Sequence, residues 1–283
     1  MAQVSDSVLT DSMDVDPALT DTEFTDQVLS IRDLGVSVGD KELLNIHSLS
    51  AGSGQLITLL GANGAGKSTL FKSITGEVQP DDRQLSRVEF HGKPVSGWPS
   101  QSLARHLGVL PQASQLSFPF TVKEVVGLGL IPLTASRAEG QCLVAEAMKQ
   151  TDTAHFADRI YTQLSGGERQ RVHLARVLVQ LSQAEQTPLL LLDEPTSAQD
   201  LGQQHQILRL AQQLCHEKQW TVIAILHDLN QALRYCDQVW LLEQGRLIEQ
   251  GLPSNVLTQS NIERVWGYRP ELVMTEQGHV VLA

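Results

Sequence analysis

The sequence predicts an α/β protein built around a parallel sheet, and three stretches carry this prediction. QLITLLGANGAGKST (55–69) has the pattern of an apolar strand, a glycine-rich turn and the start of a helix. LLLLDEP (189–195) and TVIAILHD (221–228) are apolar runs that end in polar residues. Continuous apolar runs of this length are typical of strands buried on both faces, as in parallel sheets. We therefore expect a ligand site at the carboxyl edge of this sheet.

The glycine-rich turn fits the pattern G-x-x-x-x-G-K-S without a mismatch. In such a loop, backbone N–H groups surround a phosphate chain, the lysine reaches the β- and γ-phosphates and the serine hydroxyl binds Mg²⁺. A chance glycine turn is the alternative, but a strand before the turn and a helix after it favour a P-loop. The predicted ATP-binding residues are Gly61, Ala62, Asn63, Gly64, Ala65, Gly66, Lys67, Ser68 and Thr69.

Polar side chains at the ends of the other apolar runs supply the expected chemistry. Asp193 is placed to hold the Mg²⁺, and the adjacent Glu194 is placed to orient or deprotonate the attacking water. His227 ends the next apolar run, so we expect it at the same sheet edge, within reach of a γ-phosphate. Gln112 follows the short apolar run LGVL and is uninformative on its own.

A second glycine motif, LSGGE, covers the residues Leu164, Ser165, Gly166, Gly167 and Glu168 and precedes a basic segment with helix-forming residues. Free backbone N–H groups and the positive dipole end of a helix N-terminus suit an anion. The motif therefore has the pattern of a second phosphate cradle, about a hundred residues after the first.

In this order, the P-loop, Gln112, LSGGE, the Asp-Glu pair and His227 resemble the nucleotide-binding subunit of an ABC transporter over about residues 28–260. The resemblance implies a P-loop NTPase (RecA-like) core with a flanking antiparallel β subdomain and an α-helical ABC subdomain. It implies that Glu194, His227 and Gln112 are catalytic, and that Ser68, Gln112 and Asp193 bind the metal. The implied cofactors are ATP and Mg²⁺.

The same resemblance implies that two subunits pack head to tail, so that LSGGE of one subunit covers the ATP held by the P-loop of the other. The chain contains no internal repeat, so we expect a homodimer. Two positions depart from the family pattern. Val38 stands where the family usually has an aromatic residue that stacks on adenine, and Gln199 stands where it prefers leucine, a change that we expect to matter little.

Composition sets the domain organisation. Residues 1–27 contain seven acidic residues and no Lys or Arg, which predicts a disordered acidic tail. Residues 28–283 are expected to form a single ABC ATPase domain, with a helical subdomain at about 113–161 and an amphipathic helix in AEGQCLVAEAMKQ (138–150). Strand-rich sequence at 28–60 and 88–90 predicts a small antiparallel sheet, and VWLLEQGRLIEQG (239–251) predicts a hairpin.

The net charge of −11 argues against nucleic acid as a partner. Three widely spaced cysteines have no metal-ligand spacing, and no apolar run approaches the length of a membrane span. The start of the chain has no secretory-signal pattern. A transport function therefore requires separate membrane permease subunits, two of them by the family pattern, with this chain peripheral at the cytoplasmic face of the inner membrane.

The stretch PQASQLSFPFTVKEVVGLG (111–129) resembles that of bacterial iron-chelate and vitamin B12 importers, and LSFPFTV is most similar to the haem-import branch. The end of the chain, at 251–273, is also similar to these importers. This resemblance implies haem import with a periplasmic haem-binding protein as an indirect partner. The alternatives are an iron-siderophore or B12 importer, a soluble ABC ATPase of iron–sulfur assembly, and an exporter. Alternatively, Phe118, Pro119 and Phe120 simply pack the helical insert.

Overall fold

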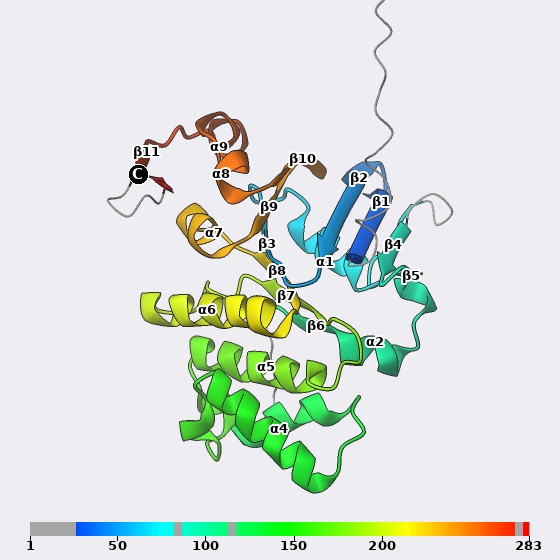
Figure 1. Cartoon of the computed structure of the whole chain (residues 1–283), viewed down its shortest axis with the longest axis vertical. Coiled ribbons are helices and arrows are strands. Elements are labelled where there is room, and N and C mark those ends of the chain that lie inside the picture. The colour runs from blue at the N-terminus through cyan, green and yellow to red at the C-terminus, as the bar shows by residue number, and fades with distance from the viewer. Residues whose placement is uncertain (1–26, 82–86, 113–115, 117, 275–279, 283) are drawn as a thin grey trace, which may run out of the picture.

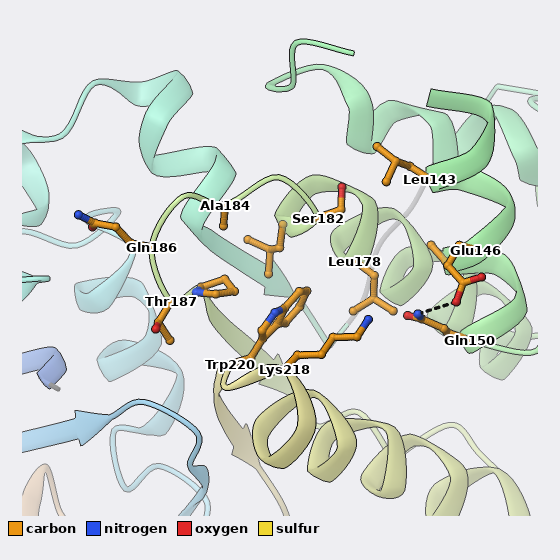
Figure 2. Close-up of a pocket in the computed structure, with 13 residues that line it drawn as sticks. Leu143, Glu146, Gln150, Leu178, Ser182, Ala184, Gln186, Thr187, Lys218 and Trp220 are labelled. Atoms are coloured by element: carbon orange, nitrogen blue, oxygen red, sulfur yellow. Dashed lines mark hydrogen bonds between the residues drawn. The ribbon is translucent and has the colours of Figure 1, made fainter. Parts of the chain in front are cut away.

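A computed structural model describes residues 27–81, 87–112, 116, 118–274 and 280–282. A ten-stranded sheet runs through this part of the chain in the order β5-β4-β1-β2-β10-β9-β3-β8-β7-β6 (Figure 1). Its strands are β1 (Gln27–Val38), β2 (Lys41–Gly52), β3 (Leu56–Leu60), β4 (Arg87–Phe90), β5 (Lys93–Pro94), β6 (Leu107–Leu110), β7 (Leu189–Asp193), β8 (Thr221–Ile225), β9 (Gln238–Glu243) and β10 (Arg246–Gly251).

The predicted parallel core is confirmed. Strands β9, β3, β8, β7 and β6 are parallel neighbours. The side chains of β7 alternate between two hydrophobic clusters, with Leu190 and Leu192 on one face and Leu189 and Leu191 on the other. Each fully buried leucine contributes roughly 1.5–3 kcal/mol to folding, so burial on both faces fixes the position of the strand end that carries Asp193.

The expected antiparallel strands flanking the core are present, and they belong to the same ten-stranded sheet as the core. Strands β5, β4, β1 and β2 pair antiparallel with one another and form one side of this sheet. The junction is a single parallel pair between Arg246 of β10 and Asn45 of β2. The Asn45 N–H donates to the Gly245 carbonyl there, at 2.8 Å.

Helices cover both faces of the sheet. They are α1 (Lys67–Ile74), α2 (Ser100–His106), α3 (Val122–Gly127), α4 (Arg137–Gln150), α5 (Gly166–Leu181), α6 (Leu201–Lys218), α7 (Leu229–Tyr235), α8 (Pro253–Val256) and α9 (Gln259–Trp266). The hydrophobic cluster on one face includes residues of α1, and the cluster on the other face includes residues of α5, α6 and α7.

The helical insert expected at 113–161 is observed in its described part, while residues 113–115 and 117 lie outside the described residues. It contains α3 and α4, and α4 is the helix predicted for 138–150. Both helices begin with a capping box, Thr121 with Glu124 and Ser136 with Glu139. Helix α4 packs beside α5 and lies at the end of the molecule away from β1 and β2 (Figure 1).

The predicted hairpin is also confirmed, because β9 and β10 pair antiparallel around Gln244 and Gly245. Both turn residues have positive φ, 48° and 81°, as a tight hairpin turn of the I′ kind requires. After α8 and α9, the strands β11 (Leu272–Met274) and β12 (Val280–Leu282) form a second, two-stranded sheet. The side chain of Asn230 on α7 exchanges two hydrogen bonds with the backbone of Leu282.

Residues 1–26 of the predicted acidic tail lie outside the described residues, and its last residue, Gln27, is the first residue of β1. Within the ranges that the structure describes, no helix is both long and apolar enough to cross a membrane.

Candidate nucleotide site

The P-loop connects β3 to α1, as predicted. Two of its glycines are required by the space around them. A Cβ atom on Gly61 would lie 2.3 Å from the carbonyl oxygen of Leu242, and one on Gly66 would lie 2.7 Å from Leu44 Cδ2. Both residues also have positive φ, 152° and 101°. The loop therefore lies directly against its neighbouring strands, with its backbone close enough to wrap an anion.

Lys67 is buried at the first position of α1, with 7% of its side chain exposed. Its Nζ donates to the carbonyl oxygens of Gly61 at 2.7 Å and Ala62 at 3.1 Å. Burial lowers the pKa of Lys67, and the negative charges of Glu194 and Asp193 act in the opposite direction. A cation bonded to two neutral carbonyls inside its own loop can exchange them for phosphate oxygens, which form stronger, charge-assisted hydrogen bonds.

Asp193 is the last residue of β7, and Glu194 follows it with a φ of 50°. Burial and the adjacent Glu194 raise the pKa of Asp193, whereas Lys67 opposes that shift. A left-handed conformation at a residue other than glycine costs on the order of 1–3 kcal/mol. Three donors hold the carbonyl of Glu194 in place: Gln170 Nε2 at 3.0 Å, Ser197 N at 3.2 Å and Ser197 Oγ at 3.0 Å.

The structure brings Gln112, Glu194 and His227 together, although they come from three separate loops. Gln112 Nε2 donates to Glu194 Oε2 at 2.6 Å, and His227 Nε2 lies 2.7 Å from Glu194 Oε1. Each oxygen of this carboxylate therefore has its own donor. The geometry fixes the carboxylate at the carboxyl edge of the sheet, as the sequence predicted.

The side chains in this region suit a magnesium–nucleotide complex. Ser68 is exposed at the start of α1, and Asp193 supplies a carboxylate. Because Gln112 turns its nitrogen toward Glu194, its amide oxygen remains for another partner. Hydroxyl, carboxylate and amide oxygens are the ligands that Mg²⁺ prefers. The donor set and the glycine cradle thus fit the predicted cofactors.

The LSGGE motif forms the start of α5. Ser165 is the N-cap: its hydroxyl accepts from Glu168 N at 3.3 Å, and Glu168 Oε2 accepts from Ser165 N at 2.7 Å. The backbone hydrogen bond from Ser165 lowers the pKa of Glu168. Leu164 and Gly167 are buried, whereas Ser165 and Gly166 are exposed. Leu164, Gly167 and the Glu168 carboxylate are thus engaged within the chain, and the exposed surface of the motif is Ser165 and Gly166.

The two glycine motifs have no direct polar contact with each other within the described residues. In the described part of the chain, no hydrogen bond or ion pair joins residues 61–69 to residues 164–168.

Two glutamines form hydrogen bonds beside the site that were not predicted from the sequence. Gln170 is buried and donates to the Glu194 carbonyl. Gln199, which we expected to matter little, donates to the Gly167 carbonyl at 2.9 Å and to Gln170 Oε1 at 3.1 Å. The only hint in the sequence was that Gln199 is polar where the family prefers leucine. Its partners could not be inferred from this, because they lie 29 and 32 residues away in the sequence.

A comparison with protein-family models finds the ABC transporter family at residues 44–197, which spans the P-loop, LSGGE and the Asp-Glu pair. The chain belongs to the ABC transporter family.

Curated relatives of this ABC protein include the hemin import ATP-binding protein HmuV of Shewanella denitrificans. It is 48% identical over 255 residues, which cover 90% of this chain and 99% of the relative. The protein of the same name from Vibrio cholerae is 48% identical over 84% of this chain and 90% of the relative.

Solved structures share the fold across different transport systems. The cbiO1 protein of Clostridium perfringens, part of the ABC transporter complex cbiONQ, is 30% identical with a TM-score of 0.72, over 84% of this chain and 94% of that chain. A bacterial Atm1-family ABC exporter with ATP bound is 29% identical with a TM-score of 0.70, over 83% of this chain and 40% of that chain. The fold is therefore common to an exporter, and it does not by itself indicate import.

Proposed function

We propose that this chain is the ATP-hydrolysing subunit of a haem importer, coupling ATP binding and hydrolysis to haem uptake through separate membrane permease subunits. The observation that carries the proposal is its 48% identity, over 90% of its length, to a hemin import ATP-binding protein. The arrangement of Gln112, Glu194 and His227 around one carboxylate supports the hydrolytic activity.

In this proposal the chain binds ATP through residues 61–69. Lys67 moves its hydrogen bonds from its own loop to phosphate oxygens, and Glu194 orients the attacking water or accepts its proton. Gln112 and His227 keep the carboxylate of Glu194 in position. Mg²⁺, held by Ser68, Asp193 and Gln112, would neutralise phosphate charge in the transition state.

The second part of the proposal is a head-to-tail homodimer. The exposed Ser165 and Gly166 lie at the N-terminus of a 16-residue helix, where free N–H groups and about half a positive charge face outward. Placed over the γ-phosphate bound by a second copy, this end of α5 would complete that site. Closure of the two subunits would then depend on ATP.

The helical insert offers a surface for the permease. Phe118 is 68% exposed and Phe120 39%, and their rings lie 6.1 Å apart. Phe118 therefore does not simply pack the insert, which was the alternative interpretation. Exposed aromatic pairs of this kind are typical of protein interfaces. We place the chain peripherally at the cytoplasmic face of the inner membrane, with a periplasmic haem-binding protein as an indirect partner.

Reconstitution with the permease tests this function. The ATPase rate in proteoliposomes should rise when the haem-loaded binding protein is added, and should not rise with a ferric siderophore or vitamin B12 and their binding proteins. Phe118→Asp should release the chain from the permease while its basal ATPase remains, and Tyr268→Asp, at a comparably exposed aromatic (59%), should not. A wild-type chain that stays wholly soluble beside its permease would rule out transport.

A further inference from the structure

The side chain of Gln199 lies between LSGGE (residues 164–168, here called the signature motif) at the start of α5 and the loop that follows Glu194. Its Nε2 donates to the Gly167 carbonyl at 2.9 Å and to Gln170 Oε1 at 3.1 Å. Its Oε1 accepts from Arg171 Nη1 at 3.2 Å. Both N–H donors of this amide and its oxygen are thus engaged, in a part-buried position.

Gln170 continues the connection to the catalytic carboxylate residue. It is buried, with 7% of its side chain exposed, and its Nε2 donates to the Glu194 carbonyl at 3.0 Å. That carbonyl belongs to a residue with a φ of 50°, a backbone conformation that its surroundings must hold. Two side chains therefore connect the strained backbone of Glu194 to Gly167 of the signature motif.

The groups that bond to the two glutamine amides determine which way each amide faces. The carbonyls of Glu194 and Gly167 can only accept, and the guanidinium of Arg171 can only donate. Both glutamine amides must therefore present nitrogen to the carbonyls, and only one orientation of each amide satisfies all partners. A carboxylate at position 199 has the same shape, but it would place an oxygen against two acceptors.

The hydrogen-bond network also extends toward His227. Gln204 on α6 donates to the backbone carbonyl of Gln199 at 3.1 Å, and Gln231 on α7 donates to Gln204 Oε1 at 2.7 Å. Helix α7 begins directly after the loop that carries His227, with Asp228 as its N-cap. The hydrogen bonds of four glutamines thus join the signature motif to the two loops that supply Glu194 and His227.

We propose that Gln199 is a positioning residue that transmits contact at the signature motif to the catalytic carboxylate of the same chain. This inference rests on the proposed function, in which one subunit offers its signature motif to one ATP and Glu194 to the other. When the partner's nucleotide binds at the start of α5, the shift of Gly167 passes through Gln199 and Gln170 to the backbone of Glu194.

Steady-state hydrolysis by the full chain tests this role. Gln199→Glu should lower kcat about tenfold and leave the KM for ATP within about twofold, because the P-loop is unchanged. In the Glu194→Gln background, ATP should still drive dimer formation by the Gln199→Glu chain on gel filtration. Gln213→Glu, an exposed glutamine on α6, makes the same charge change and should leave kcat unaltered. If Gln199→Glu does not fold, Gln199→Met removes the same donors without adding a charge.

A double-mutant cycle separates transmission from local damage. Gln170→Met should lower kcat by a similar factor, and the double variant should be no slower than the slower single variant, since both interrupt one connection. An unchanged kcat in the Gln199 variants, multiplied effects in the double variant, or loss of the ATP-dependent dimer together with kcat would overturn the inference. A wild-type chain without ATPase activity would instead refute the proposed function.

Discussion

His227 Nε2 lies 2.7 Å from Oε1 of Glu194, so a half-exposed histidine at the end of one strand holds the carboxylate at the end of the neighbouring strand. The other carboxylate oxygen accepts from Gln112. A carboxylate with both oxygens held has a fixed direction, which a general base needs more than it needs high basicity.

Removing His227 should therefore impair hydrolysis more than binding. His227→Ala should lower kcat by at least about tenfold, because a base whose direction is no longer fixed loses part of the roughly 100- to 10,000-fold that general-base catalysis contributes, and it should leave the affinity for ATP nearly unchanged. His216 provides the control, because its side chain is also 50% exposed and its Nε2 lies 3.1 Å from a carboxylate, that of Asp237. His216→Ala should retain wild-type kcat, and an equal loss in both variants would show that the effect of His227 is structural.

The buried His173 should make stability depend on pH. Its Nε2 lies 2.8 Å from the Tyr161 hydroxyl, its Nδ1 has no hydrogen-bond partner among the described residues, and burial lowers its pKa from 6.5 to about 4. Between about pH 6.5 and pH 4, His173 binds a proton in the unfolded chain but stays neutral in the folded chain. The free energy of unfolding therefore falls as the pH drops below about 6.5. Between pH 8 and pH 5.5 the loss should be on the order of 1 kcal/mol.

Urea unfolding of the wild type and of His173→Gln at the two pH values measures this contribution. Glutamine can still bond the Tyr161 hydroxyl, but it does not titrate, so the variant should lose less stability than the wild type over the same interval, by on the order of 1 kcal/mol. Equal pH dependence in the two proteins would mean that His173 is protonated in the folded state.

Base recognition should be loose. Val38 is 68% exposed at the end of β1, where the family pattern has an aromatic residue. An aromatic partner contributes roughly 1–3 kcal/mol per stacked base, so without it the phosphates carry most of the affinity. The KM for GTP should lie within about threefold of that for ATP, and Val38→Tyr should lower both values. A tenfold preference of the wild type for ATP would mean that another side chain reads the base.

The P-loop, the Asp-Glu pair and His227 could be located in the sheet from the sequence, because each follows a buried strand whose apolar residues fix its place. Glu194 and His227 therefore lie at one edge, as expected from LLLLDEP and TVIAILHD, whereas Gln112 after LGVL was uninformative until the order of the motifs gave the resemblance. The joining of the antiparallel strands to the core was not predictable in this way, since it depends on one backbone pair, Arg246 with Asn45. A single pair leaves no pattern in the sequence.

The roles of Gln170 and Gln199 were hidden for a related reason. Glutamine is usually a surface residue, and nothing in the local sequence indicates that a particular side chain will bond to a carbonyl many residues away. Only the packing of α5 against the loop after β7 brings Gln199 to Gly167 and Gln170 to Glu194.

In the proposed homodimer, the LSGGE motif of one subunit acts on ATP held by the other. Gly166 suits a test because a Cβ there would meet only Ala198 Cβ, at 3.8 Å, whereas one on Gly167 would lie 2.8 Å from a backbone oxygen. An aspartate at the first position of α5 is also compatible with the helix dipole. Gly166→Asp should therefore fold normally while placing a carboxylate against the γ-phosphate of the partner's nucleotide.

The most direct measurement is gel filtration with ATP and Mg²⁺, combined with nucleotide binding. Glu194→Gln alone should bind ATP, nearly stop hydrolysis and elute as a stable dimer. Glu194→Gln with Gly166→Asp should bind ATP with similar affinity, because the P-loop belongs to the same chain, but should elute as a monomer. A double variant that still dimerises, or that loses ATP binding as a monomer, would contradict the account.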